Sequence, residues 1–292
     1  MSIESKPVPW PTKDSDGEDS VPVFEIRPPR GWLTLNLREL WEYRELLYIL
    51  AWRDVKVRYK QTAIGALWVV LQPILTMVLF SVLFGSFAQL PSGGIPYPIF
   101  VFTGLLPWQL FARALSDSST SLVANQGLIS KIYFPRLMIP FASVLAGLVD
   151  FGIALLVLIV LMLVYGIVPT VAIFTLPLFL LLTVATALAV GLWLSALNVK
   201  YRDVMYTIPF LTQFWFFATP IAYSSAIVPE QWRVLFGLNP MVGVVEGFRW
   251  ALLGNSAAPG ALLAVSTVIV VILLAGGLVY FRRTEKSFAD LV

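Results

Sequence analysis

Long apolar segments alternate with shorter polar ones along most of this chain. Six segments have the length and composition of membrane-spanning helices: 64–88, 99–115, 137–167, 171–197, 205–223 and 260–281. A hydrocarbon core of roughly 30 Å is crossed by about 20 apolar helical residues. The pattern therefore predicts an all-α membrane protein with six transmembrane helices, of which the second is short and is followed by a loop over 116–136.

Two other segments have the pattern of helices that do not cross. Residues 35–62 mix charged and aromatic side chains, and Tyr43, Leu47 and Leu50 recur at helical spacing. This favours an amphipathic helix on the cytoplasmic membrane surface, and a helix packed on a partner subunit is the alternative. The apolar run 240–253 is too short to cross, so it predicts short re-entrant helices in the last external loop.

Positive charge orients these segments. With the N-terminus inside, all but two of the 20 Lys and Arg residues fall on the cytoplasmic side, and only Arg233 and Arg249 lie outside. Because cytoplasmic loops carry the excess of Lys and Arg, we expect both termini in the cytoplasm. The predicted domains are a disordered tail (1–34), the interfacial helix (35–62), the six-span domain (63–281) and a cytoplasmic C-terminal tail (282–292).

Composition excludes several functional classes. Hydrophobic residues make up 58% of the chain and charged residues only 13%, too few to coat a soluble protein of this length. The basic groups sit where the topology places them, so nucleic acid is not an expected partner. Without Cys or His the chain has no thiol nucleophile, no imidazole base and no zinc ligand of either type. No phosphate-binding loop occurs either. We expect no catalytic residue, metal site or cofactor in this chain, and any ATP must be bound by another subunit.

Charged residues in the apolar regions are the first functional candidates. Asp150 is the one carboxylate well inside a predicted span, and an intramembrane acid suggests ion coupling. The alternative is a satisfied residue that faces the bundle interior or a subunit interface. Glu246 and Arg249 are three residues apart on one helix face and could pair as an external gate, or serve as a purely structural pair.

Two further groups are candidates for ligand contact. Tyr206, Phe210, Phe214 and Phe217 form a stripe at helical spacing, and aromatic faces can stack on sugar rings. Lipid-facing or core packing is the alternative for this stripe. A basic cluster lies at the mouth of the first predicted span and could bind anionic headgroups or the pyrophosphate of a lipid carrier. The alternative is that this cluster only anchors the span. This cluster consists of Arg53, Lys56, Arg58 and Lys60.

Four motifs in a fixed order carry a family resemblance. They are RDVKVRYKQT (53–62) followed by Gly65, Trp68 and LQP (71–73), then KIYFPR (131–136), NVKYRD (198–203), and NP (239–240) followed by Glu246 and Arg249. Over about residues 35–285 the chain resembles ABC-2 type permeases that export polysaccharides such as O-antigen, teichoic acid and capsule. Only the acidic N-terminal tail departs from the pattern.

The resemblance implies a homodimer in the bacterial inner membrane, with two copies of a separate ABC ATPase that binds ATP and Mg. It implies export of a glycan or polyol-phosphate polymer attached to undecaprenyl diphosphate, and the alternative is another lipid-linked polymer or a small amphiphile such as a drug. The two cytoplasmic motifs would transmit the motion of the ATPase. Their residues are Lys131, Tyr133, Arg136, Lys200, Arg202 and Asp203.

Rival classes lack their own signals in this sequence. A membrane-embedded glycosyltransferase needs paired carboxylates at a membrane face, and none is evident. A secondary carrier needs several coupling acids within its spans and related halves, and the sequence shows neither.

Overall fold

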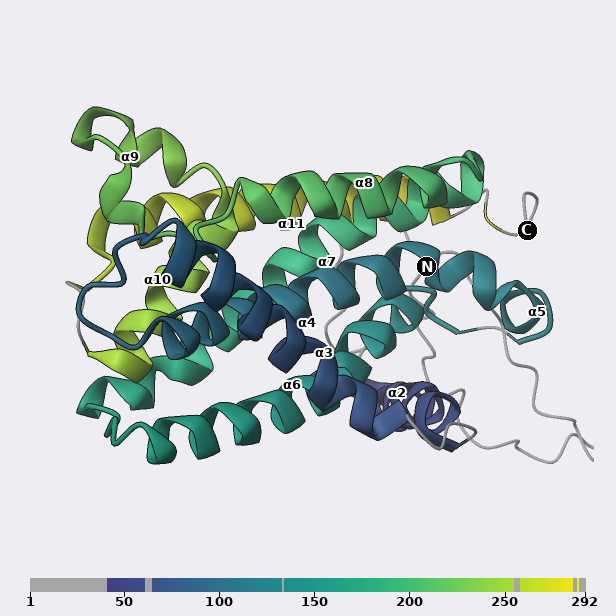
Figure 1. The fold of residues 1–292 in the computed structure, drawn as a ribbon. Helices are drawn as coiled ribbons and strands as arrows, with labels where there is room; N and C mark the ends of the chain where they lie inside the picture. Colours follow the sequence, from purple (N-terminus) through teal and green to yellow (C-terminus); the bar gives the residue numbers. More distant parts are fainter. Residues whose placement is uncertain (1–40, 61–64, 133, 255–257, 286–287, 289–292) are drawn as a thin grey trace, which may run out of the picture.

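The computed structural model describes residues 41–60, 65–132, 134–254, 258–285 and 288, and no strand occurs among them. The chain folds into a bundle of helices, most of them running along one common direction (Figure 1). The helices are α2 (Arg44–Lys60), α3 (Gly65–Phe80), α4 (Tyr97–Ala124), α5 (Gln126–Ile129), α6 (Met138–Val164), α7 (Leu176–Lys200), α8 (Val204–Phe217), α9 (Glu230–Phe236), α10 (Pro240–Leu253) and α11 (Gly260–Glu285). A π-helical segment (Ser81–Phe87) continues α3, and 3₁₀ turns occupy Val171–Thr175 and Ser225–Ile227.

Five helical stretches are long and apolar enough to cross a membrane. They are Leu67–Phe87, Tyr97–Ala124, Met138–Val164, Val171–Lys200 and Gly260–Glu285. The sixth predicted span, 205–223, contains α8, which has only 14 residues. Five predicted spans are therefore confirmed as helices of sufficient length, while the six-span topology, the orientation of the termini and the membrane-surface position of the first helix stay predictions.

The prediction of a short second span was wrong. Helix α4 runs for 28 residues and includes much of the segment expected to be a cytoplasmic loop. Its polar C-terminal half stays helical because hydroxyl side chains bond back to carbonyls one turn earlier. Ser119 Oγ donates to the Leu115 carbonyl at 2.5 Å, and Thr120 Oγ1 donates to the Ser116 carbonyl at 3.1 Å.

The structure describes parts of three of the four predicted domains, whose boundaries stay predictions. The tail 1–34 lies outside the described residues, as do residues 35–40 and 61–62 of the interfacial segment, of which α2 is the described part. At the other end, α11 runs past the predicted boundary at residue 281 and ends at Glu285. The Phe288 side chain is buried against Phe281, with ring centroids 5.4 Å apart.

Helix α4 lies at the centre of the bundle and packs on α3, α6, α7 and α10. Small residues bring the helices together: a Cβ atom on Gly277 of α11 would lie 2.9 Å from the Ala189 carbonyl oxygen of α7. In a membrane, where lipid is as apolar as the protein, such close approach lets dispersion forces hold helices together.

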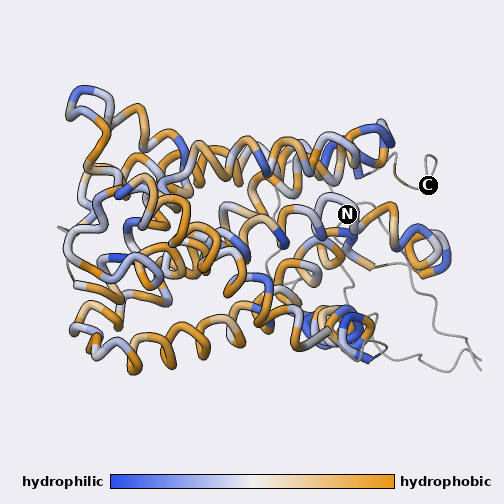
Figure 2. Tube along the Cα trace, viewed as in Figure 1, coloured by the Kyte–Doolittle hydropathy of each residue, from blue (hydrophilic) through white to orange (hydrophobic). Residues whose placement is uncertain are grey.

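Hydrophobic residues run along the length of the bundle, and hydrophilic residues gather at α2, at α5 and near α9 (Figure 2). Large apolar side chains are exposed on the outer faces of α6 and α11, among them Leu163, Val164, Val271 and Ile272. A surface of this kind is suited to lipid rather than water.

Candidate functional site

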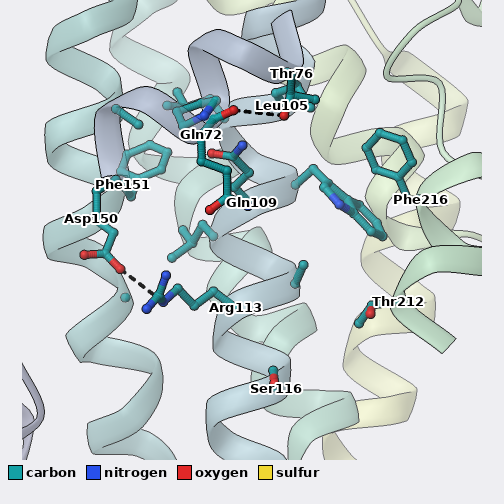
Figure 3. Close-up of a pocket in the computed structure, with 18 of the residues that line it drawn as sticks. Gln72, Thr76, Leu105, Gln109, Arg113, Ser116, Asp150, Phe151, Thr212 and Phe216 are labelled. Atoms are coloured by element: carbon teal, nitrogen blue, oxygen red, sulfur yellow. Dashed lines mark hydrogen bonds and ion pairs between the residues drawn. The ribbon is translucent and has the colours of Figure 1, made fainter. Parts of the chain in front are cut away.

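An open cavity of about 600 Å³ lies between α3, α4, α6 and α8 (Figure 3). Its walls combine aromatic rings with polar side chains. The aromatic rings are Phe80, Trp108, Phe151 and Phe216, and the polar side chains are Gln72, Thr76, Gln109, Arg113, Ser116, Asp117, Asp150, Thr212 and Gln213.

Three amide side chains in this wall have no protein partner. Gln72 on α3, Gln109 on α4 and Gln213 on α8 make no side-chain hydrogen bond to another residue in the described part of the chain. Gln72 and Gln213 are exposed and Gln109 is half-buried, so all three amides can bind water or a polar ligand in the cavity. The cavity is therefore chemically suited to a hydroxylated ligand.

Four charged side chains form a cluster at one side of the cavity. Asp150 Oδ2 accepts a hydrogen bond from Arg58 Nη1 at 2.6 Å and lies 3.3 Å from Arg113 Nε. The second nitrogen of Arg58, Nη2, donates to Asp117 Oδ2 at 2.7 Å. The cluster thus joins α2, α4 and α6, and Figure 3 shows Asp150 and Arg113 pointing toward each other.

Tyr59 completes this cluster from α2, because its hydroxyl donates to Asp150 Oδ1. Burial, with the hydrogen bond to Asp150 and the charge of Asp150 adding to it, raises the pKa of Tyr59 to about 12. The phenol is therefore protonated at neutral pH and donates this hydrogen bond. Both carboxylate oxygens of Asp150 accept hydrogen bonds within one protomer. This agrees with the alternative interpretation of Asp150 as a satisfied residue that faces the bundle interior.

The predicted basic cluster is divided by the structure. Arg58 turns toward the bundle, whereas Arg53 pairs with Asp54 at 2.7 Å and Lys56 Nζ lies 5.7 Å from the centre of the Trp52 ring. Arg53, Lys56 and Lys60 instead line a groove of about 410 Å³ on the outer face of α2, together with Tyr48, Ile49, Trp52 and Val57. The predicted headgroup residues therefore lie on two faces of one helix.

The aromatic stripe on α8 lies outside the protomer's core. Tyr206 is 77% exposed and Phe217 is 62% exposed, and Phe210 and Phe214 fall between these values. The cavity is lined by other residues of the same helix, Thr212, Gln213 and Phe216. The core-packing alternative does not hold within one protomer, which leaves lipid, a second subunit or a ligand as neighbours of the stripe.

Glu246 and Arg249 form a buried pair on α10, with 3.1 Å between Glu246 Oε1 and Arg249 Nη1. Arg249 also donates to the Ile221 carbonyl at 2.8 Å and to the Tyr223 carbonyl at 3.3 Å. Its guanidinium carbon lies 3.7 Å from the centre of the Phe100 ring. The pair therefore fastens the segment after α8 to α4 and α10, and a role as an external gate stays a prediction.

The apolar run 240–253, expected to form short re-entrant helices, forms the single helix α10, which is buried against α4, α7 and α11 and is preceded by α9. A re-entrant position of this segment in the membrane stays a prediction. Helix α10 begins at Asn239, whose side chain accepts hydrogen bonds from the Met241 amide at 3.0 Å and from Trp215 Nε1 at 2.7 Å. The capping residue of α10 is thereby bound to α8. The sequence did not predict this link. A capping residue indicates a backbone donor in its own helix, here the Met241 amide, but not a side-chain donor on another helix, here Trp215 of α8.

The elements next to the described coupling residues, α5 and the turn between α7 and α8, lie at the end of the bundle that also holds α2. Lys131 is exposed, and so are Lys200, Arg202 and Asp203 around the turn between α7 and α8. Arg136 is half-buried and donates to the Glu285 carbonyl. Tyr133 lies outside the described residues.

Comparison with known proteins gives a consistent set of similarities. The profile of the ABC-2 type transporter family matches residues 45–253. The chain is 34% identical over 261 residues to the O-antigen export system permease protein RfbA of Myxococcus xanthus, covering 88% of this chain and 98% of that protein. The RfbA protein of Klebsiella pneumoniae is 30% identical over 85% of this chain and 95% of its own length. The polysialic acid transport protein KpsM of Escherichia coli is 25% identical over 80% of this chain and 92% of its own.

Proposed function

The chain belongs to the ABC-2 type transporter family, and on that premise we propose that it exports an O-antigen-like polysaccharide linked to undecaprenyl diphosphate. It is a multi-pass protein of the inner membrane and serves as the permease subunit. The observation that carries the substrate class is the nearly full-length match to permeases for O-antigen export, at 34% and 30% identity.

The family implies an ATPase partner, and we assign ATP and Mg to that subunit, present in two copies. Exposed charged residues at the α7–α8 turn and at Lys131 support this assignment, because they offer a polar surface at one end of the bundle. ATP-driven closure of the two ATPase copies would move this end. Helices α4 and α7 end there and α8 begins there, so these three helices would carry the motion to the cavity.

We infer a homodimer, supported by the exposed face that α3 and α8 present. Leu79 on α3 and Phe87 on the π-helical segment that continues it are exposed, as are Phe210 and Phe214 on α8. These two helices also form two walls of the cavity. Two copies that meet along this face would place two cavities side by side, with the aromatic stripes between them as a path for sugar rings.

The outer face of α2 is our assignment for the diphosphate headgroup. Lys56 and Lys60 lie there on the same face as the Trp52 ring, and the ammonium groups form no ion pair with another described residue. Clustered Lys side chains attract phosphate at a cytoplasmic leaflet. Arg58 is excluded from this assignment, because its guanidinium binds two carboxylates.

The experiment that tests the function is deletion of the protein in its host. We expect lipid-linked glycan to accumulate at the cytoplasmic face and to disappear when the wild-type protein is restored. Normal surface glycan in the deletion strain would overturn the proposal.

The headgroup assignment is tested in the same strain. Lys56→Ala combined with Lys60→Ala should lower export, while Lys56→Arg with Lys60→Arg should retain it. Equal export by both double variants would remove the headgroup assignment.

The stripe has its own test. The double substitution Phe210→Ala and Phe214→Ala removes two exposed rings without opening the protomer's core, so folding should be preserved while export falls by about tenfold or more. Phe174→Ala is the matched control, because Phe174 is equally exposed but lies away from the cavity in the turn before α7. Wild-type export by the double variant, with the assembled complex present, would place the sugar path elsewhere.

A second candidate is export of another lipid-linked polymer, such as teichoic acid or capsule, or of a small amphiphile. The match to KpsM favours capsule among these, at a lower identity than the matches to RfbA. The nature of the lipid-linked material trapped in the deletion strain separates the two candidates.

A further inference from the structure

Helix α2 is attached to the bundle by apolar contacts along its N-terminal half and by polar contacts at its C-terminal end. Leu50 and Val55 are buried, and Leu46, Leu47 and Ala51 pack against the hydrophobic cluster that contains Leu50. At the other end Arg58 and Tyr59 reach three side-chain oxygens on α4 and α6. The position of the C-terminal end of this helix is therefore set by polar contacts.

Asp150 is the centre of those contacts. It stands near the middle of α6, and both of its oxygens accept hydrogen bonds from α2. It also lines the cavity, together with Arg113 and Asp117. Asp150, with Asp117 beside it, thus connects a helix outside the cavity with the cavity wall itself.

The cluster is electrically balanced only while α2 is docked. Two arginines, Arg58 and Arg113, face two carboxylates, Asp117 and Asp150. If α2 moves away, Arg58 leaves with it and the wall keeps one cation against two anions. A buried carboxylate without its partner is costly, so the docked position is favoured.

We propose that Asp150 is the positioning residue that couples α2 to the cavity. Through Arg58 and Tyr59 it holds α2 in the position that neutralises the cavity wall, so that release of α2 charges the wall negatively and docking restores neutrality. An anionic lipid diphosphate is repelled by the charged state and accepted by the neutral one. This role in transport rests on the proposed function, whereas the tether between α2 and α6 does not.

The test compares four variants in the purified complex. Asp150→Asn weakens the tether and leaves an excess of positive charge, whereas Arg58→Gln weakens it and leaves an excess of negative charge. Arg58→Gln combined with Asp150→Asn also lacks the tether but keeps the charges balanced, because Arg113 and Asp117 remain. Asp54→Asn is the matched control, since it removes a carboxylate that pairs with an arginine on α2 itself and makes no link to the bundle.

Hydrogen exchange of the α2 amides is the first measurement. A positioning role predicts exchange faster by about tenfold in Asp150→Asn and in the double variant, with α6 unchanged and with wild-type rates in Asp54→Asn. Unchanged exchange of α2 in the double variant would overturn the tether. This result does not depend on what the protein exports.

Export and substrate-stimulated ATP hydrolysis are the second measurement. The charge-balanced double variant should keep the thermal stability, the basal ATP hydrolysis and the KM for lipid-linked glycan of the wild type, because its cavity wall stays neutral when α2 is released. Arg58→Gln alone leaves two carboxylates against one arginine in the wall, so its KM for lipid-linked glycan should rise by about tenfold. Equal KM values for these two variants would overturn the link between α2 and the charge of the wall. If the wild-type complex itself failed to export glycan, the proposed function would fall while the exchange result stood.

Discussion

Replacing Arg249 with methionine is expected to destabilise the protein by about 3–5 kcal/mol, the cost of leaving a buried charge without its partner. The substitution keeps most of the side-chain volume but removes every hydrogen bond of the guanidinium. Glu246 would then be buried and unpaired, and the Ile221 and Tyr223 carbonyls would lose their donors. The segment after α8 should detach from α4 and α10.

Thermal unfolding of the purified protein measures this effect. Arg44→Met is the matched control, since Arg44 is exposed and its hydrogen bond within the described part of the chain is to the Trp41 carbonyl three residues earlier. The double variant Glu246→Gln with Arg249→Met should recover part of the loss, because the unpaired charge is gone. Equal unfolding temperatures for Arg249→Met and Arg44→Met would show that the pair does not hold the fold together.

Gly277→Ala is expected to separate α7 from α11 and to cost about 1–3 kcal/mol, as overpacked cores do. The new methyl group would lie 2.9 Å from the Ala189 carbonyl oxygen and 3.1 Å from two atoms of the Trp193 ring. Neither neighbour can yield easily. The carbonyl is backbone, and the Trp193 ring is stacked on Tyr280 and bonded to the Leu273 carbonyl.

Gly152→Ala is the control for this substitution. A Cβ atom at Gly152 meets nothing within 4 Å, so the change adds the same methyl group to a helix without a clash. Alanine is the better helix former, and Gly152→Ala should be neutral or slightly stabilising. The close contact would be disproved if both variants unfolded at the same temperature.

The spans could be predicted from the sequence because hydropathy and length do not depend on which helix packs on which. The end of α4 could not, since Ser116–Ser121 reads as a polar loop until the hydroxyl groups are seen to bond back to their own helix. Ser and Thr side chains can bond to the nearby backbone in loops as well as in helices. The pattern of residue types alone does not say which outcome prevails.

The charged cluster was only half predictable. Asp150 stands out as a carboxylate within a span, but its donors lie 92 and 37 residues away in the chain, at Arg58 and Arg113. The one local signal was the i,i+4 spacing of Arg113 and Asp117. Arg58 was predicted to face a ligand, because the spacing on α2 does not reveal which face of this helix meets the bundle.

The 14 residues of α8 have a consequence for the surrounding lipid. At 1.5 Å per residue the helix is about 21 Å long, against a hydrocarbon thickness of about 30 Å. If α8 is the predicted sixth span, we expect hydrophobic mismatch of this size to make the bilayer thinner beside the helix. A thinner bilayer there would shorten the apolar distance that a sugar-bearing headgroup has to travel.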